Sequence, residues 1–276
     1  MEVKIFKGSE IFMEAINKFY LNNEKIEAIN EFTEDSEKGS IIYEVLRVIN
    51  GKAVFLRDHI ERMKRSFALI NMEFPFEIEA VEKKVNEVIK NNDNVLGNIK
   101  ITYNTASNNL KIYYIKHSYP NDELYNKGVK TILYYGEREN PNAKIVNTSF
   151  REKVTEEIKK SNAFEAILVD RNGLITEGSK SNIFAIKDGK IITAKAEAVL
   201  KGITREKIIG IAKSIGIEVE EADIKAIDID KLEAMFISGT SPKILPISFV
   251  NNIKLDVNNI TLRKLMKAYN ELLEGK

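Results

Sequence analysis

The chain of 276 residues contains no cysteine. This absence excludes disulfide bonds, thiolate nucleophiles, iron–sulfur clusters and zinc sites built on cysteine. Histidine is almost as scarce, since only His59 and His117 are present. A metal centre built on several histidines is therefore not expected, and we predict no metal site.

An excess of charge of one sign is also missing. Lysine and arginine number 42 against 41 aspartate and glutamate residues, which gives a formal net charge of +1. Such a balance provides no broad field for nucleic acid or anionic lipid, so a small-molecule ligand is the better expectation. No run of about 18 apolar residues is long enough to span a bilayer, and Met1–Ser9 lacks the apolar core of a signal peptide. We therefore expect a cytoplasmic protein without membrane partners.

Hydrophobic residues make up 43% of the chain, enough for the core of one large domain or two ordinary ones. In the first half, strand patterns alternate with helical apolar spacing, and Asn50-Gly51 indicates a hairpin turn because both residues tolerate positive φ. Asp58 is a candidate N-cap for the first helix. The first half is thus predicted to be α+β, with strands at Ile41–Ile49, Ala53–Leu56, Asn98–Asn104 and Leu110–His117 and helices at Asp58–Asn71 and Pro75–Lys90.

The stretch Ser118–Gly128 is rich in turn-forming residues and lacks clear periodicity, which predicts a linker. We place an N-terminal domain at residues 1–120, the linker at 121–128 and a C-terminal domain at 129–276. The second domain is predicted to contain strands at Val129–Tyr135, Ala166–Val169, Leu174–Thr176, Ile183–Ile186, Lys190–Thr193, Glu218–Glu221 and Ala234–Ser238, and helices at Ser149–Ser161, Thr204–Ile215, Asp228–Leu232 and Thr261–Leu273.

Two glycine-containing turns in the second half could bind an anion. Gly202-Ile203-Thr204-Arg205 precedes a predicted helix, whose free N–H groups and positive dipole end attract negative charge. Ser238-Gly239-Thr240-Ser241-Pro242 directly follows an apolar strand, and a tight turn there would offer hydroxyls and backbone N–H groups to an oxyanion. Taken alone, a helix capped by Thr204 and an ordinary Gly-Ser turn are the commoner interpretations.

Four side chains could complete a site for a phosphorylated ligand. Arg62 lies beside the apolar stripe of its predicted helix and could point into a domain interface, although most helical arginines are solvated. His59 is expected to pack or cap rather than to act as a base. Lys144, in a loop before a helix, could supply a buried amine, and Glu177, at the end of a hairpin strand, could hold a pyridine nitrogen protonated.

Three blocks in the second half follow one another in an order and spacing found in a known family. Glu177-Gly178-Ser179-Lys180-Ser181-Asn182-Ile183-Phe184 looks like E-G-x-x-x-N-x-F, and Leu200-Lys201-Gly202-Ile203-Thr204-Arg205 looks like L-x-G-I-T-R. Phe236-Ile237-Ser238-Gly239-Thr240, closed by Pro246, is similar to the third block. The chain thus resembles the fold-type IV pyridoxal-phosphate enzymes, which include branched-chain aminotransferases, D-amino-acid aminotransferases and 4-amino-4-deoxychorismate lyases. The resemblance begins at Tyr43-Glu44-Val45-Leu46-Arg47 and runs almost to the C-terminus.

The resemblance implies a fold, a cofactor and an assembly. The fold would be α+β, with a smaller N-terminal α/β domain and a larger C-terminal mixed α/β domain. The cofactor, pyridoxal 5'-phosphate, would lie in the cleft between the two domains. The assembly would be a homodimer in which the partner chain completes the substrate pocket.

Carried over position by position, the resemblance also implies the cofactor contacts. Lys144 would carry the cofactor as a Schiff base, and Glu177 would contact the pyridine nitrogen. The phosphate would be held by four residues, of which the second and third act through their backbone: Arg62, Ile203, Thr204 and Thr240. Lys153, Lys159 and Lys160 are alternatives to Lys144, but their spacing places them on the following helix, facing solvent.

The substrate side of the site departs from the family patterns. Three residues are expected to face the substrate: Tyr43, Arg47 and Ser241. Of these, Arg47 is the candidate contact for a distal carboxylate. The Arg and His that trap the substrate carboxylate in D-amino-acid aminotransferases are missing, because Thr105–Asn109 stands there. The spacing from Lys144 to Asn147 looks like that of the deoxychorismate lyases, and the acidic segment Asn30–Gly39 is atypical of the family.

Three functions follow from these observations. The leading hypothesis is an aminotransferase that moves an amino group between a branched-chain-like or related amino acid and a 2-oxo acid such as 2-oxoglutarate. Lys144 would shuttle the proton, and the kinetics would be ping-pong. The second hypothesis is 4-amino-4-deoxychorismate lyase, which eliminates pyruvate and gives 4-aminobenzoate. The third is a non-catalytic pyridoxal-phosphate-binding protein, which the retention of both Lys144 and Glu177 disfavours.

Overall fold

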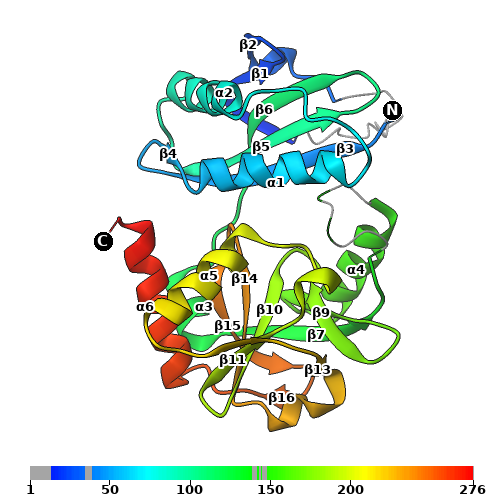
Figure 1. Ribbon diagram of the computed structural model, residues 1–276, viewed down its shortest axis with the longest axis vertical. Coiled ribbons are helices and arrows are strands. Elements are labelled where there is room, and N and C mark those ends of the chain that lie inside the picture. Colours follow the sequence, from blue (N-terminus) through cyan, green and yellow to red (C-terminus); the bar gives the residue numbers. More distant parts are fainter. Residues whose placement is uncertain (1–13, 35–38, 139–141, 143, 145–147, 276) are drawn as a thin grey trace, which may run out of the picture.

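The computed structural model describes residues 14–34, 39–138, 142, 144 and 148–275. Within these residues it has two β-sheets, one from each half of the chain, and helices pack on both. Figure 1 shows the two halves stacked along the longest axis, with α1 and α2 in the N-terminal half and α4, α5 and α6 in the C-terminal half. The predicted α+β fold with a smaller first part and a larger second part is confirmed. The domain limits at 1–120 and 129–276 stay a prediction, and the linker proposed at 121–128 contains the short helix α3 (Asp122–Lys127).

The first sheet has six strands in the order β2-β1-β6-β5-β3-β4, all antiparallel. One face is apolar because alternate residues of each strand point to it, and helices α1 (Leu56–Ala68) and α2 (Ile78–Asn91) cover that face. A short 3-10 turn at Ile29–Glu31 follows β2. The strands are β1 (Ala15–Asn22), β2 (Lys25–Ala28), β3 (Ile41–Ile49), β4 (Lys52–Ala53), β5 (Gly97–Asn104) and β6 (Asn109–Ile115).

The passage from the first hairpin into α1 differs from the prediction. The strand predicted at Ala53–Leu56 is wrong, since β4 ends at Ala53 and the helix already begins at Leu56. Phe55 adopts left-handed backbone angles, with φ 54 and ψ 36, which end the extended path. Asp58 is not the N-cap: it lies in the first helical turn and accepts a hydrogen bond from Lys207 Nζ at 2.8 Å. A short apolar run fits both patterns, so the sequence alone did not locate this break.

The second sheet is built around β15, a strand that the sequence analysis missed together with β1 and β2. Its order is β12-β11-β10-β14-β15-β7-β8-β9-β13, and β16 pairs with β15. Pro246 lies within β15, opposite Phe236 of β14. The strands are β7 (Val129–Tyr135), β8 (Glu165–Val169), β9 (Leu174–Gly178), β10 (Asn182–Lys187), β11 (Lys190–Thr193), β12 (Val219–Glu221), β13 (Ile224–Lys225), β14 (Ala234–Gly239), β15 (Lys243–Val250) and β16 (Ile253–Lys254).

One further pairing closes part of the second sheet into a ring. Asn182 of β10 pairs with Glu177 of β9, so the path from β10 through β14, β15, β7, β8 and β9 returns to β10. In the described residues, four α-helices and two 3-10 turns belong to this half: α3, which packs on its core, α4 (Thr148–Lys160), α5 (Ile203–Ser214), α6 (Ile260–Leu273), and the turns Ala196–Ala198 and Ala226–Lys231. The closure places Glu177 next to the segment that leads into α5.

No helix in the described part of the chain is long and apolar enough to cross a membrane. Across those same residues, no group of three or more His, Asp or Glu side chains is arranged to hold a metal ion.

Candidate active site

Lys144 is held against the first half of the molecule by its backbone. Its carbonyl oxygen accepts a hydrogen bond from the Tyr43 N–H at 3.1 Å, and its own N–H donates to Ser66 Oγ at 3.3 Å. Burial lowers the pKa of the Lys144 amine, and the charge of Arg62 adds to this effect, while Tyr43 and Glu44 oppose it. The amine is therefore more easily deprotonated than an exposed lysine. Asn147 and part of Asn30–Gly39 lie outside the described residues.

Tyr43 is the side chain that Lys144 faces. The residue is 6% exposed, and the Lys144 Nζ lies 4.9 Å from the centroid of its ring. Arg151, from the first turns of α4, donates a hydrogen bond to the Tyr43 hydroxyl. Burial alone would raise the pKa of Tyr43, but the positive charges of Lys144 and Arg151 outweigh it and lower the pKa to about 8. A partly ionised tyrosine at a cluster of cations is unusual outside functional sites.

Arg62 is fixed by a buried carboxylate. Glu44 is fully buried and accepts hydrogen bonds from Arg62 Nε at 2.8 Å and Nη2 at 2.5 Å, and its other close neighbour is His59 Nδ1 at 2.7 Å. Burial would raise the pKa of Glu44, yet the attraction of Arg62 lowers it to about 2. Arg62 Nη1 also donates to the Lys201 carbonyl at 3.3 Å, across to the second half. Arg62 is thus buried and bridges the two halves of the molecule, and His59 is a packed partner of Glu44.

Glu177 lies at the other side of the site and is 3% exposed. Its Oε1 accepts a hydrogen bond from Arg138 Nη1 at 2.9 Å, and its Oε2 accepts one from the Leu200 N–H at 3.2 Å. Burial raises the pKa of Glu177, while the charges of Arg138 and Lys144 act in the opposite direction. The charge of Lys144 is thus among the influences on the pKa of Glu177.

The turn before α5 is shaped by a close backbone approach. Asn182 Nδ2 donates to the Leu200 carbonyl at 2.8 Å, and a Cβ on Gly202 would lie only 2.1 Å from Asn182 Oδ1. Gly202 is the N-cap of α5, with no side chain capping it. The interpretation of Thr204 as a mere helix cap is therefore wrong. The first N–H groups of the helix have no capping side chain and can bind an anion.

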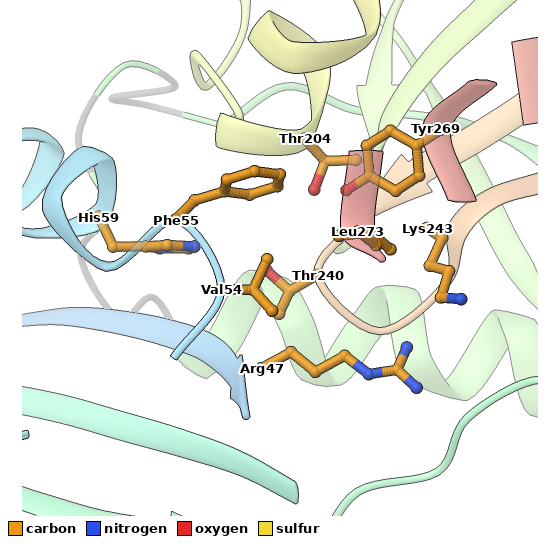
Figure 2. Close-up of a pocket in the computed structure, with 9 residues that line it drawn as sticks. All are labelled: Arg47, Val54, Phe55, His59, Thr204, Thr240, Lys243, Tyr269 and Leu273. Atoms are coloured by element: carbon orange, nitrogen blue, oxygen red, sulfur yellow. The ribbon is translucent and has the colours of Figure 1, made fainter. Parts of the chain in front are cut away.

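The Thr240-Ser241 turn joins the second half to the first sheet. Thr240 Oγ1 donates to the Val45 carbonyl at 3.1 Å, and Asn98 Nδ2 donates to Ser241 Oγ at 2.8 Å. Figure 2 shows a small pocket beside this turn, with Thr204 and Thr240 on its walls and Arg47 at its lower edge.

Arg47 lies on the same face of β3 as Tyr43, four residues further along the strand. Its guanidinium carbon stacks 3.7 Å from the centroid of the Tyr119 ring. Its Nε and Nη1 are buried and have no hydrogen-bond partner among the described residues. Unmet donors on a buried cation favour an anionic ligand at this edge of the pocket.

Sequence reasoning missed four charged residues of this site. Glu44 stood within the stretch where the resemblance begins but was given no role, and three cations were passed over: Lys100, Arg138 and Arg151. Arginine and lysine are so common in this chain that a single position cannot be assigned to a site from the sequence unless its partner is known. Only the closeness of Arg138 to Lys144 along the chain could have drawn notice. By contrast, the prediction that Lys153, Lys159 and Lys160 lie exposed on the next helix is confirmed.

Comparison with known proteins identifies the family of the chain. The family model described as amino-transferase class IV matches residues 41–250. A D-alanine aminotransferase from Listeria innocua is 28% identical over 287 residues, covering 93% of this chain and 99% of the relative. A crystal structure of a T.th. branched-chain amino acid aminotransferase with pyridoxamine 5'-phosphate matches with a TM-score of 0.85 at 22% identity, over 95% of this chain and 96% of the other.

A protein from Legionella pneumophila assigned as a 4-amino-4-deoxychorismate lyase also shares the architecture. It matches with a TM-score of 0.76 at 20% identity, over 84% of this chain and 91% of the other. At these identities the two solved structures show a common fold, which confirms the predicted fold type. They do not separate the transferase and lyase hypotheses, since both activities occur on this fold.

Proposed function

The chain belongs to the amino-transferase class IV family, and on that premise we propose that it transfers an amino group between an amino acid and a 2-oxo acid such as 2-oxoglutarate. The amino acid would be branched-chain-like or related. Enzymes of this family use pyridoxal 5'-phosphate, and we propose the same cofactor here. The observation that carries the proposal is the Lys144 amine, whose pKa burial lowers and which lies within electrostatic reach of Arg62 and Glu177.

The residues present fit the cofactor. Lys144 would supply the amine for an imine link, and the carboxyl group of Glu177 would contact the pyridine nitrogen. Each Glu177 oxygen accepts one hydrogen bond, from Arg138 or from Leu200, and a carboxylate oxygen has capacity for two, so there is room for a pyridinium N–H. The phosphate would be held by Arg62, by the backbone N–H groups of Ile203 and Thr204, and by the backbone N–H of Thr240, whose hydroxyl donates to the Val45 carbonyl. Gly202 allows the helix start to come close, because a Cβ there would clash.

The cofactor, when bound, supplies an aldehyde carbon and an electron-withdrawing ring. The chain supplies the proton transfer. Because burial lowers the pKa of Lys144, its Nζ is a base of suitable strength to take the substrate Cα proton and to return it. Glu177 would keep the pyridine nitrogen of the cofactor protonated, and Arg62 would hold its phosphate in place. Tyr43 and Ser241 would contact the substrate, together with Arg47 for a longer one.

An amino-donor panel tests the proposal. Purified protein saturated with pyridoxal 5'-phosphate would be mixed with L-leucine, L-glutamate or D-alanine, and the absorbance of the bound cofactor followed. We expect a spectral change with at least one L-amino acid, and formation of a new amino acid when a second 2-oxo acid is added. Absence of any change with every donor would contradict catalysis and favour the non-catalytic binding protein.

A lyase acting on 4-amino-4-deoxychorismate is the second candidate. The observation in its favour is Arg47, which has unmet donors and whose backbone lies about 13 Å along β3 from that of Tyr43, at roughly 3.3 Å per residue. A ring-sized substrate with more than one carboxylate could use both ends of this strand. Formation of pyruvate and 4-aminobenzoate from aminodeoxychorismate, without glutamate formation from leucine and 2-oxoglutarate, would replace the transferase proposal with this one.

The assembly and location are also proposals. We propose a homodimer, as the family resemblance implies, and a cytoplasmic enzyme with no nucleic-acid or membrane partner. Sedimentation of the purified protein at two concentrations tests the dimer: a single species of one-chain mass at both would contradict it.

A further inference from the structure

The face of the first sheet that is turned away from its helices is polar. On β3 and β5, the directly paired residues of this face are Tyr43 with Thr102, Val45 with Lys100, and Arg47 with Asn98. The contacts of Val45 and Asn98 with the Thr240-Ser241 turn show that the second half lies over this face. A substrate reacting at Lys144 therefore rests on polar side chains of β3 and β5.

Three cations, from β5, from α4 and from the loop before α4, converge on the Tyr43 ring. Lys144 Nζ lies 4.9 Å from the ring centroid, the Arg151 guanidinium carbon 5.4 Å, and Lys100 Nζ 5.6 Å. In the described part of the chain, one carboxylate pairs with this set, that of Glu14, which binds Lys100 Nζ at 2.6 and 2.8 Å. The cluster carries more positive than negative charge, which favours an anionic ligand.

Of the three cations around Tyr43, Arg151 is the one with donors available for an anionic ligand. It donates to the Tyr43 hydroxyl, and no carboxylate among the described residues forms an ion pair with it. A guanidinium has five N–H donors in a planar fork, so the contact with Tyr43 orients the group and leaves donors for a carboxylate. The Lys144 Nζ and the Arg151 guanidinium carbon lie 4.9 and 5.4 Å from one ring centroid, so they are at most about 10 Å apart, a separation that a five-carbon dicarboxylate can bridge when each cation contacts one of its ends. Arg47, about 13 Å from Tyr43 along the strand, is too distant for the same molecule.

We propose that Arg151 binds the side-chain carboxylate of the substrate and so determines a preference for acidic amino acids and dicarboxylic 2-oxo acids. Tyr43 orients the guanidinium for this contact. The inference rests on the proposed function, and it replaces Arg47 by Arg151 as the distal carboxylate contact for small substrates.

The test compares two ligands that differ in one carboxylate. Glutarate and valerate have five carbons each, and neither can be transaminated. Calorimetric titration of the holoenzyme with each would be done for wild type, Arg151→Gln and Lys153→Gln, the last being a control from an exposed position on the same helix. We expect Arg151→Gln to weaken glutarate binding by about 10- to 100-fold, as for loss of a charge-assisted hydrogen bond, and to leave valerate binding unchanged. Lys153→Gln is expected to match wild type for both.

Steady-state kinetics give a second readout, in which KM for 2-oxoglutarate rises in Arg151→Gln by a similar factor while KM for 2-oxovalerate stays constant. Arg151→Lys, which keeps the charge but loses the fork, is expected to recover part of the glutarate affinity and supplies the test if Arg151→Gln does not fold. Equal losses for glutarate and valerate would overturn the inference and indicate a structural role. Unchanged glutarate binding would overturn it as well.

The inference and the proposed function fail in different ways. If wild type transfers no amino group but Arg151→Gln still loses glutarate selectively, the carboxylate site stands without the activity. If wild type transaminates and Arg151→Gln keeps its preference for glutarate over valerate, the activity stands and the assignment of Arg151 is wrong.

Discussion

Replacing Glu44 by glutamine tests how the phosphate-side arginine is held. Glu44 is fully buried between Arg62 and His59, and glutamine would remove the charge while nearly keeping the shape. The guanidinium of Arg62, 5% exposed, would then be buried without a carboxylate. Breaking a buried pair in this way costs about 3–5 kcal/mol. We therefore expect the free energy of unfolding to fall by about that amount at pH 7.

The same carboxylate should shape the acid side of the stability curve. Glu44 has a pKa of about 2 in the folded protein, against an ordinary value of 4.5. A depressed carboxyl pKa stabilises the fold fully above the ordinary value, and this contribution is lost as the pH falls from about 4.5 towards 2. At about 1.36 kcal/mol for each pH unit, the contribution is about 3 kcal/mol. Glu44→Gln lacks it, so its stability should fall less steeply than that of wild type over this range.

Urea unfolding at pH 7, 5, 4 and 3 measures both effects, with circular dichroism and tyrosine fluorescence as probes. The matched control is Glu79→Gln. Glu79 forms an ion pair at 3.0 Å with Arg57, which lies on α1 as Arg62 does, but this pair is on the exposed surface. The control is expected to follow wild type throughout. If Glu44→Gln were as stable as wild type at pH 7, and if its free energy of unfolding fell equally steeply at acid pH, the description of Glu44 as the buried partner that holds Arg62 would be refuted.

Two further predictions concern the substrate and phosphate sides. In the apoprotein, Tyr43 should ionise with a pKa of about 8, so that it is neutral at lower pH and negatively charged at higher pH. Titration followed by absorbance at 295 nm should show this transition in wild type and not in Tyr43→Phe. Identical titration curves for the two proteins would contradict the cation cluster around Tyr43. Gly202→Ala should destabilise the protein by about 1–3 kcal/mol and weaken cofactor binding, because its Cβ meets Asn182 Oδ1 at 2.1 Å. Gly210 lies on the same helix, and a Cβ there would have no neighbour within 4 Å, so Gly210→Ala should stabilise the protein by about 0.5–1 kcal/mol in thermal unfolding. Equal effects of the two variants would contradict the close approach of Gly202 to Asn182.

The strands that the sequence predicted best are those with a single dominant pattern. Ile41–Ile49 and Val129–Tyr135 occur with the predicted limits, since each is an apolar-rich run bounded by turn residues. The central strand β15 was missed: it contains Pro246, which cannot donate to a ladder and so weakens the strand pattern. The predicted start of α1 was wrong because Phe55 adopts a left-handed backbone conformation, which is uncommon for a phenylalanine and cannot be predicted from its residue type.

The candidate site divides in the same way. Glycine, asparagine and acid positions in the three matched blocks were visible because their types and spacing are distinctive. The residues that surround Tyr43 were not, because Arg138, Arg151 and Lys100 become neighbours only when two sheets and α4 come together. The roles of these residues depend on which side chains are neighbours in the folded protein, and spacing along the chain does not show this. The roles of all the site residues stay predictions until measured.

Borohydride reduction of the protein loaded with pyridoxal 5'-phosphate, followed by peptide mass mapping, tests the central claim most directly. We predict that the reduced cofactor is attached at Lys144 and at no other lysine, and that Lys144→Ala keeps the fold but loses the fixed cofactor. Attachment at another lysine, or undiminished fixation in Lys144→Ala, would contradict the account.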